Sequence, residues 1–398
     1  MTSRTQGPLS GTLVVDLSRA LAGPHATMML GDLGARIIKV ENPGAGDDTR
    51  GWGPPFIQPD VPEARRESTY FLSANRNKES IALDLKDEAD RQALIALVRR
   101  ADVLVENFRT GVLDRLGLGF AYLHELNPRL VILSISGFGH DGPEGGRAGY
   151  DQIAQGEAGL MSLTGSGKDD PQKVGTPISD LIAGMYGAFG VLAALQQRQQ
   201  SGEGTVIRTS LLAATVGVHS FQGTKWTIAG EVGHGQGNHH TSIAPYGLFR
   251  CADGAVQIAV GSEGLWLRFC EGFGLDAAAE GFATNGERVK NRDRLITVVE
   301  QAFSTWKAAD LLGRLDEVGI PAGKVRSIDE VYDWPQMHSQ GLVIDVEHAT
   351  LGPLRLPGPP LRFFDREGQE TTRNAHQAPP VLDGHGEDLR RWLDEEGA

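Results

Sequence analysis

Cysteine is scarce in this sequence: the 398 residues include only Cys251 and Cys270. Two cysteines cannot make a disulfide framework or a CxxC metal site, so we expect a reducing compartment. The first residues, MTSRTQGPLSGTLVVDLS, lack the apolar core of a signal peptide. The uncharged stretch Leu181–Leu195 has 15 residues, fewer than the ~20 that span a bilayer. We therefore expect a soluble, cytoplasmic protein with no membrane partner.

Positive charge is also in deficit. Lys and Arg number 38 against 51 Asp and Glu, and the formal net charge is −13. Binding to the phosphate backbone of a nucleic acid needs a basic surface, so we expect no nucleic-acid partner. A small anion is not excluded, because a local cluster of arginines outweighs the distant net charge.

Short apolar runs alternate with helical patterns in the N-terminal half of the chain. The spacing predicts helices over Pro24–Leu33 and Asp87–Arg100. The predicted strands are 12–18, 35–41, 80–85, 102–107, 130–137 and 204–212. This alternation indicates an α/β fold with a doubly wound, Rossmann-like parallel sheet. Ligands of such sheets lie beyond the carboxyl ends of the strands, so the residues after each strand carry the most weight.

The pattern changes near residue 225. Two apolar runs around Asp253-Gly254 predict a hairpin, and helical patterns follow at about 264–274, 290–306 and 308–318. We expect a large α/β domain over 1–224 and a smaller α+β domain over 225–325. The remaining residues, 326–398, are expected to complete the large domain with a second hairpin at 342–358 and a helix at about 385–396.

Motifs of well-known chemistry are incomplete. The segment SRALAGP after the first predicted strand lacks the GxGxxG of dinucleotide-binding folds. LTGSGKDD resembles a P-loop, but Ser162 stands where the first glycine belongs and Asp169 where Ser or Thr belongs. His234, His239 and His240 cluster without the spacing of a metal site, so solvated histidines are the better interpretation. We expect no metal.

Asp180 is the one acid in an unusual setting, GTPISDLIAGMYGAFGVLAAL (175–195). It precedes a long uncharged stretch that predicts a buried helix. Asp is among the best N-cap residues, which gives Asp180 a purely structural interpretation. Alternatively, a carboxylate at a helix start and partly excluded from water could act as a covalent nucleophile toward an activated acyl group. The residues alone leave both open.

The whole chain resembles the family III CoA-transferases, the group of formyl-CoA transferase and carnitine CoA-transferase, together with the related α-methylacyl-CoA racemases. Six ordered blocks carry the likeness. They are LVVDLSRALAGPHATMMLGDLGARIIKVENPGAGDDTR, NRNKESIALDLK, ADVLVENFRTGVLDRLGLG, NPRLVILSISGFG, GYDQIAQGEAGLMSLTG and SDLIAGMYGAFGVLAALQQRQQSGEGTVI. The resemblance implies the large CoA-binding domain, the small domain and a homodimer of two chains interlocked as rings.

The resemblance makes Asp180 the catalytic nucleophile. A carboxylate is ordinarily ionised at neutral pH and needs no base to attack a thioester. The implied route runs through a mixed aspartyl–acyl anhydride and released CoA thiolate, and then through an aspartyl-CoA thioester. Coenzyme A and acyl-CoA are substrates in this route, and no tightly bound cofactor is expected.

The resemblance also assigns CoA contacts residue by residue. They are Leu21 and Ala22 near the thioester and pantetheine, the segment Leu83 to Lys86 near the adenine, Asn107, Phe108 and Arg115 in VENFRTGVLDRLG, and Arg147 as a second anion partner. Core packing for Phe108 and a solvated helix face for Arg115 remain alternatives. Asn42 stands where formyl-CoA transferase has an arginine.

The loop GHGQGNHH (233–240) matches a glycine-bearing substrate loop of the family. The backbone N–H groups around Gly237 and Asn238 are our candidates for donors to the tetrahedral intermediates. The loop lacks the run of consecutive glycines found in formyl-CoA transferase, which argues against oxalate and formyl-CoA. The blocks QGNHHTSIAPYGLF and VGIPAGKVRSIDEV look most like members that use succinyl-CoA and a dicarboxylate.

Tyr150 separates two activities of this scaffold. The related racemases carry His in the GHD block and use it as one of two acid–base groups, whereas this chain reads GYD. Tyrosine, with a pKa near ~10, is a poor base at neutral pH, so a CoA-transferase is favoured. Tyr150 could instead be a buried tyrosine with a satisfied hydroxyl. A racemase, or a CoA-binding protein without turnover, remains the alternative.

Overall fold

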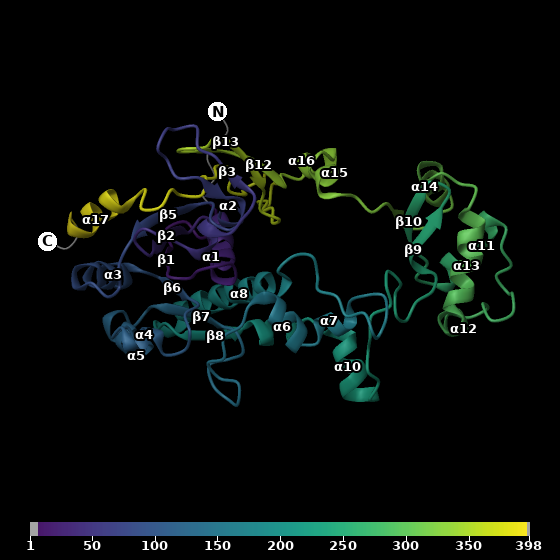
Figure 1. Ribbon diagram of the computed structural model, residues 1–398, viewed down its shortest axis with the longest axis horizontal. Helices are drawn as coiled ribbons and strands as arrows, with labels where there is room; N and C mark the ends of the chain where they lie inside the picture. Colours follow the sequence, from purple (N-terminus) through teal and green to yellow (C-terminus); the bar gives the residue numbers. More distant parts are fainter. Residues whose placement is uncertain (1–6, 396–398) are drawn as a thin grey trace. The chain divides into compact units, whose positions relative to one another are not determined.

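The six apolar runs predicted as strands form one parallel sheet in a computed structural model that describes residues 7–395 (Figure 1). The strands are β1 (Leu13–Asp16), β2 (Arg36–Glu41), β5 (Lys78–Ala82), β6 (Val103–Glu106), β7 (Val131–Ser136) and β8 (Val206–Ser210). Their order in the sheet is β5-β2-β1-β6-β7-β8. The chain therefore runs outward from β1 in one direction and then from β6 in the other. The crevice between β1 and β6 is the point where a doubly wound sheet binds its ligands.

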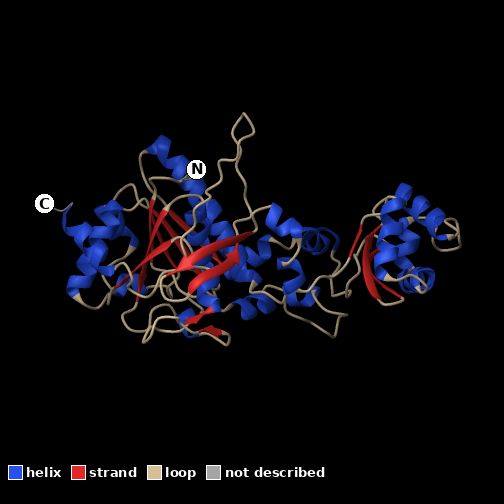
Figure 2. Ribbon diagram, turned by 90° about the horizontal axis from the view of Figure 1, so that it is seen from above, coloured by secondary structure: helices blue, strands red, loops and turns tan. Residues whose placement is uncertain are grey.

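Helices cover both faces of this sheet (Figure 2). One face packs against α1 (Ala22–Asp32), α8 (Ile178–Ser201) and α9 (Leu211–Gly217), and the other against α3 (Glu88–Arg100), α4 (Val112–Arg115), α5 (Phe120–Leu126) and α17 (Gly386–Glu395). The predicted helices at 24–33 and 87–100 are confirmed as α1 and α3. Asp87 caps α3 by accepting hydrogen bonds from the N–H groups of Ala89 and Asp90.

Two glycines allow α8 to pack closely against α1 and β7. A Cβ atom on Gly184 would lie 2.6 Å from the carbonyl oxygen of Ala22 in α1, and one on Gly187 would lie 2.8 Å from the side chain of Leu133 in β7. The opposite face of α8 stays open, with Phe189 exposed by 70%. The prediction of a buried helix is therefore only half right. Its glycines, not bulky side chains, bring it close to the core.

Among residues 7–395, α8 is also the one helix long and apolar enough to cross a membrane by length and composition. The most apolar window of α8 is 44% buried. Its packing against α1, β7 and β8 is that of a core helix.

Two compact units divide the chain, and each is described by itself. The larger holds the described residues up to 160, 174–224 and those from 335 onward, and the smaller holds 161–173 and 225–334. Residues 1–6 and 396–398, at the ends of the first and last predicted domains, lie outside the described residues. The return segment adds a hairpin of β12 (Val343–His348) and β13 (Gly352–Pro357) and ends in α17 beside α3 and β5 (Figure 1).

The smaller unit has its own core. The predicted hairpin is confirmed as β9 (Tyr246–Cys251) and β10 (Gly254–Ala259), with β11 (Ala322–Gly323) added to it. The helices α11 (Glu263–Phe273), α13 (Arg292–Phe303) and α14 (Ala308–Glu317) pack on this sheet around Trp266, Phe269 and Phe303.

The remaining elements of the whole described chain are short. They are η1 (Asp48–Gly51), β3 (Phe56–Ile57), β4 (Glu67–Ser68), α2 (Thr69–Ser73), α6 (Asp151–Glu157), α7 (Leu160–Leu163), α10 (Ser220–Ala229), α12 (Asn285–Lys290), α15 (Ile328–Tyr332) and α16 (Pro335–Ser339).

Gly184→Ala tests the close packing of α8 against α1. The new methyl group meets a backbone carbonyl at 2.6 Å, so the helices must separate, and we expect a loss of ~1–3 kcal/mol in the free energy of unfolding. The matched control is Gly313→Ala in α14, where the added Cβ meets nothing within 4 Å. Removing that helical glycine should leave stability unchanged or raise it by up to ~1 kcal/mol. Denaturant unfolding of both variants measures the difference, and equal effects would contradict the close packing of α1 and α8.

Candidate active site

Two chain segments meet at the switch point of the sheet. Asn107, directly after β6, holds the peptide of Arg19, which follows β1: its amide oxygen accepts the Arg19 N–H at 2.8 Å, and its amide nitrogen donates to the Arg19 carbonyl at 2.7 Å. The next residue, Ala20, has a φ of +64°, a conformation that costs an L-residue energy. Asn107 thus fixes the backbone of the crevice in an otherwise unfavourable shape.

Buried charged side chains also bind the backbone of residues 18–20. The Lys39 ammonium donates to the carbonyl oxygen of Ser18 at 2.9 Å and forms an ion pair with Asp47 at 2.8 Å. The Asp47 carboxylate in turn accepts the N–H of Ala20 at 3.2 Å. Lys39 and Asp47 are almost completely buried. A buried charge without a partner is strongly destabilising. Backbone conformations of residues 18–20 that would break this ion pair are therefore disfavoured.

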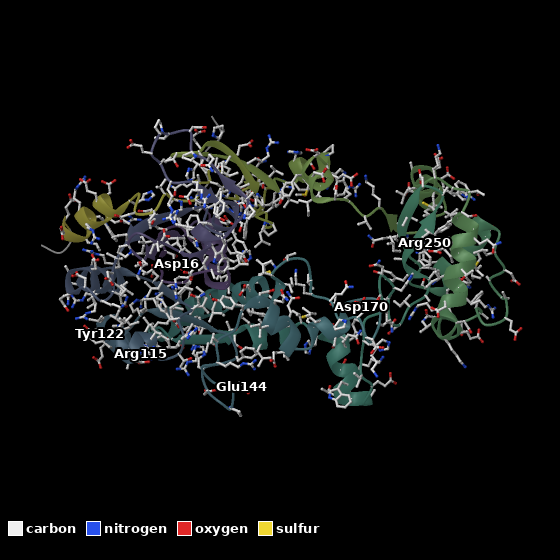
Figure 3. All side chains as sticks on the ribbon, in the orientation of Figure 1. Asp16, Arg115, Tyr122, Glu144, Asp170 and Arg250 are labelled. Atoms are coloured by element: carbon white, nitrogen blue, oxygen red, sulfur yellow. The ribbon has the colours of Figure 1, made fainter. Side chains whose placement is uncertain are left out.

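A second buried ion pair lies beside the first. Lys78 contacts Asp16 at 3.0 Å and also donates to the carbonyl of Pro24 in the first turn of α1. Burial alone would raise the pKa of Asp16, but the positive charges of Lys78 and Lys39 outweigh it and lower that pKa far below its usual range. Burial lowers the pKa of Lys78 to about 8. Asp16 lies in the interior of the larger unit among densely packed side chains (Figure 3).

A cavity of about 390 Å³ opens above these segments. Its lining includes backbone and side chains from 19–22, 107–110 and 146–152, together with Trp52, Tyr70 and Asp180. All of these belong to the larger unit. The cavity therefore lies at the carboxyl edge of the sheet, where the sequence pattern predicts a ligand.

Asp180 enters this cavity from the first turn of α8. It is the third residue of the helix, and Pro177 occupies the N-cap position without a side-chain cap. The N-cap interpretation of Asp180 is therefore wrong. Asp151 performs that task from α6: its Oδ1 accepts the N–H of Ser179 at 2.8 Å and the N–H of Asp180 at 3.3 Å. The carboxylate of Asp180 is left free for chemistry.

The electrostatics of Asp180 differ from those of an ordinary carboxyl group. Protein surrounds most of its side chain, and this burial, together with the negative charge of Asp151, raises the pKa of Asp180 to about 7. The ionised carboxylate expected at neutral pH is thus only partly populated. Burial and the charges of Asp180 and Asp151 also raise the pKa of the Tyr70 hydroxyl to about 12, so Tyr70 remains a hydrogen-bond donor.

The predicted CoA contacts fall mostly around two adjoining cavities. Leu21, Ala22, Asn107 and Phe108 line the first cavity. A second cavity of about 340 Å³ is lined by Leu83 to Lys86 and again by Phe108. The Phe108 side chain packs partly against the sheet core and also lines both cavities. Core packing and a position at the ligand cavity are therefore both true of Phe108. Arg19 and Arg109, which the sequence reasoning did not select, line both cavities.

Two predicted anion partners are placed differently. Arg115 is exposed on α4, near the edge of the larger unit (Figure 3), and is absent from the lining of both cavities, as its solvated-face alternative implies. Arg147 lines the first cavity, but its guanidinium pairs with Glu144 at 3.1 Å and Glu157 at 2.8 Å. CoA binding by either arginine stays a prediction. Arg109, two residues after Asn107, is the better-placed cation.

Tyr150 is at the N-cap position of α6 with its side chain exposed by 67%. The alternative of a buried tyrosine is therefore wrong. Tyr150, Asp151 and Asp180 line the same cavity. Sequence reasoning weighed Tyr150 and passed over its neighbour Asp151, although both stand in the GYD block.

The glycine-bearing loop belongs to the smaller unit, where its backbone is firmly bonded. The Gly237 N–H donates to the carbonyl of Gly165 at 2.8 Å, so in this arrangement it cannot serve a substrate oxygen, contrary to our expectation. The Arg292 guanidinium donates to the amide oxygen of Gln236 at 2.6 Å and to the carbonyls of His240 and Thr241. Asn238 stays a candidate donor. No group of three or more His, Cys, Asp or Glu within 7–395 is placed to hold a metal ion.

Comparison with known proteins points to one family. A model of the family described as CoA-transferase family III matches residues 9–386. The succinyl-CoA:glutarate CoA-transferase of Homo sapiens is 38% identical over 380 residues, 95% of this chain and 84% of that protein. A succinate–glutarate CoA-transferase of Agrobacterium fabrum is 41% identical over 342 residues, 85% of each chain. The crystal structure of a CAIB/BAIF family protein from Brucella suis has a TM-score of 0.85 at 39% identity and covers 98% of this chain and 100% of that one.

Asp180→Asn tests the electrostatics of the site through stability. Because folding raises the pKa of Asp180 from 3.8 to about 7, the contribution of this carboxyl group to stability falls as the pH rises from about 4 to 7, by up to ~1.4 kcal/mol per pH unit. The variant has no such charge, so its stability relative to wild type should increase across that window and level off above it. Thermal unfolding at a series of pH values measures this.

Asp170→Asn is the control of opposite sign. Hydrogen bonds from Ser166 and Gln172 lower the pKa of Asp170, so removing its charge should cost stability above pH 4. A flat pH dependence for the difference between Asp180→Asn and wild type would contradict the raised pKa of Asp180.

Proposed function

We propose that this chain, which belongs to CoA-transferase family III, moves CoA from an acyl-CoA donor to a free carboxylic acid through covalent intermediates on Asp180. The activity class follows from family membership; the nucleophile and the route are our proposal. One observation carries it: the Asp180 carboxylate lies in the cavity that Leu21, Ala22 and Phe108 also line. A carboxylate in that position can reach a thioester bound along these segments.

The covalent steps take place between the two substrates and the Asp180 carboxylate. An Asp180 oxygen attacks the acyl carbon, the C–O bond forms, the C–S bond breaks, and the electron pair leaves on sulfur as the CoA thiolate. The thiolate then attacks the Asp180 carbonyl carbon of the anhydride and releases the donor acid, which leaves an aspartyl-CoA thioester. The acceptor carboxylate repeats both steps in reverse order and leaves as its CoA thioester.

We propose succinyl-CoA as the donor and a dicarboxylic acid as the acceptor. Two relatives, at 38% and 41% identity, are named for succinyl-CoA or succinate together with glutarate. The substrate-loop block QGNHHTSIAPYGLF supports the same class. A binding pocket discriminates between acceptors that differ by one methylene by only ~1–3 kcal/mol.

Asp180→Ala should abolish transfer from succinyl-CoA to every acid in a panel of dicarboxylates and monocarboxylates. We expect a fall of at least about 10³-fold, because the covalent step is lost. Binding of CoA, measured by calorimetry, should stay near the wild-type value. In the wild type, hydroxylamine added after acyl-CoA should modify a peptide that contains Asp180, as mass spectrometry of the digest reports.

Three results would contradict the proposal. They are transfer by Asp180→Ala above a few per cent of the wild-type rate, a modified peptide without Asp180, and α-deuteration of a 2-methylacyl-CoA in deuterated water without CoA transfer to any acid. The last is the racemase outcome.

We further propose that two copies of the chain form a dimer, interlocked as the family resemblance implies. The support is an apolar surface on the larger unit made by Met185, Tyr186, Phe189 and Leu192 of α8 with Val216 and Phe221, each exposed by 37% or more. Exposed apolar side chains on the packed helices α8 and α9 support a contact with another protein. A second copy is the occupant that family resemblance supports.

Phe189→Glu should weaken that dimer, because a charge replaces a side chain that is exposed by 70% in the single chain and would be buried in the contact. Light scattering should give twice the chain mass of 42.7 kDa for wild type and a smaller mass for the variant. Val61→Glu, at an exposed apolar site outside this face, is the control. A wild-type monomer would contradict the dimer, and a dimeric mass for all three proteins would contradict this face as its contact.

A further inference from the structure

Asp151 has no part in the covalent steps, yet it is the carboxylate that the structure brings to the nucleophile. It lines the same cavity as Asp180 and accepts hydrogen bonds from the N–H groups of Ser179 and Asp180 itself. We propose that Asp151 is a positioning residue that fixes the first turn of α8 and makes the negative charge of Asp180 unfavourable, so that acylation relieves the repulsion. This inference rests on the proposed function.

The Asp151 carboxylate is held on both oxygens. Oδ1 takes the two N–H groups of α8, and Oδ2 accepts a hydrogen bond from the Gln155 amide at 2.7 Å. Gln155 is completely buried, and its own oxygen accepts the Val174 N–H at 2.9 Å. Asp151 therefore cannot turn away from Asp180 without breaking its hydrogen bonds from α8 and from Gln155 of its own helix α6. Its charge is a fixed part of the site.

Other charges near Asp180 do not offset that of Asp151. Among residues 7–395, no protein donor is hydrogen bonded to the Asp180 carboxylate. Tyr70 of α2 faces it as a neutral hydroxyl. Of the cavity arginines, Arg19 pairs with Asp48 at 3.6 Å, and Arg147 pairs with two glutamates. Arg109 also lines the cavity, yet burial and Asp151 prevail in the pKa of Asp180.

Acylation and protonation remove the same charge. When the Asp180 oxygen bonds to the acyl carbon and the C–S bond breaks, the negative charge passes from the carboxylate to the CoA sulfur. Whatever disfavours the carboxylate at position 180 therefore favours the anhydride and the thioester over the free enzyme. Each unit by which Asp151 raises the pKa of Asp180 favours the acylated enzyme over the free enzyme by about tenfold, at a pH where Asp180 is ionised.

Asp151→Asn and Gln155→Leu separate the charge of Asp151 from its orientation. The asparagine keeps an oxygen for the two α8 N–H groups and loses the charge, whereas Gln155→Leu keeps the charge and loses one of its bonds. The first measurement compares Asp151→Asn with the double variant Asp151→Asn/Asp180→Asn. The stability difference between these two proteins should level off at a lower pH than the value of about 7 expected when Asp151 is present. We also expect the acidic limb of the kcat profile to move with it. In addition, kcat should fall by about tenfold with little change in KM for acyl-CoA.

Gln155→Leu should leave the midpoint of both pH curves in place. Asp151→Ala, which loses the helix cap as well, should unfold at a lower temperature than Asp151→Asn. An unchanged midpoint in Asp151→Asn, or an equal downward shift in Gln155→Leu, would overturn the inference. The stability curves need no turnover, so they test Asp151 independently: activity retained by Asp180→Ala would instead defeat the proposed function.

Discussion

The crevice depends on charges buried beneath the carboxyl edge of the sheet. Lys39, Asp47, Lys78 and Asp16 lie almost fully out of contact with solvent, and they bind the backbone of 18–20 and the start of α1. Arg50, packed between Glu41 and Glu67, continues the network. Buried ion pairs are weak contributors to net stability, because desolvation offsets their attraction. What they supply here is a single geometry, since each alternative would leave a charge unpaired.

Two buried aspartates show how pairing decides their roles. Asp16 has two lysines within the network, and its pKa falls despite complete burial. Asp180 is also mostly enclosed, but its charged neighbour is another carboxylate, and its pKa rises. The first acid is a fixed structural anion. The second changes its charge near pH 7, and only its ionised form can act as the nucleophile that we propose.

Local pattern predicted the sheet because most of its strands are short β-branched apolar runs. The exception is β5 (Lys78–Ala82, KESIA), which begins two residues before the predicted range 80–85. It also singled out Asp180, whereas Phe108 and the segment at Leu21 came from the family resemblance. It missed Asp151 and Tyr70, because their importance comes from approach to α8 across many residues of sequence. It misjudged α8, because exposed Phe189 and buried Ile182 look alike in a list of apolar residues. The commitment of the Gly237 N–H to Gly165 depends on a contact that spacing cannot reveal.

The glycine-bearing loop has a consequence for engineering. Its bonds run to Gly165 and Ser162, and to Arg292 of α13, all within the smaller unit. The shape of the loop is therefore encoded by three separate stretches of chain. Grafting 233–241 alone into a relative would leave the loop without its supports. An exchange that carries 161–173 together with 225–334 would transplant the loop with its hydrogen-bond partners and leave the sheet and Asp180 unchanged.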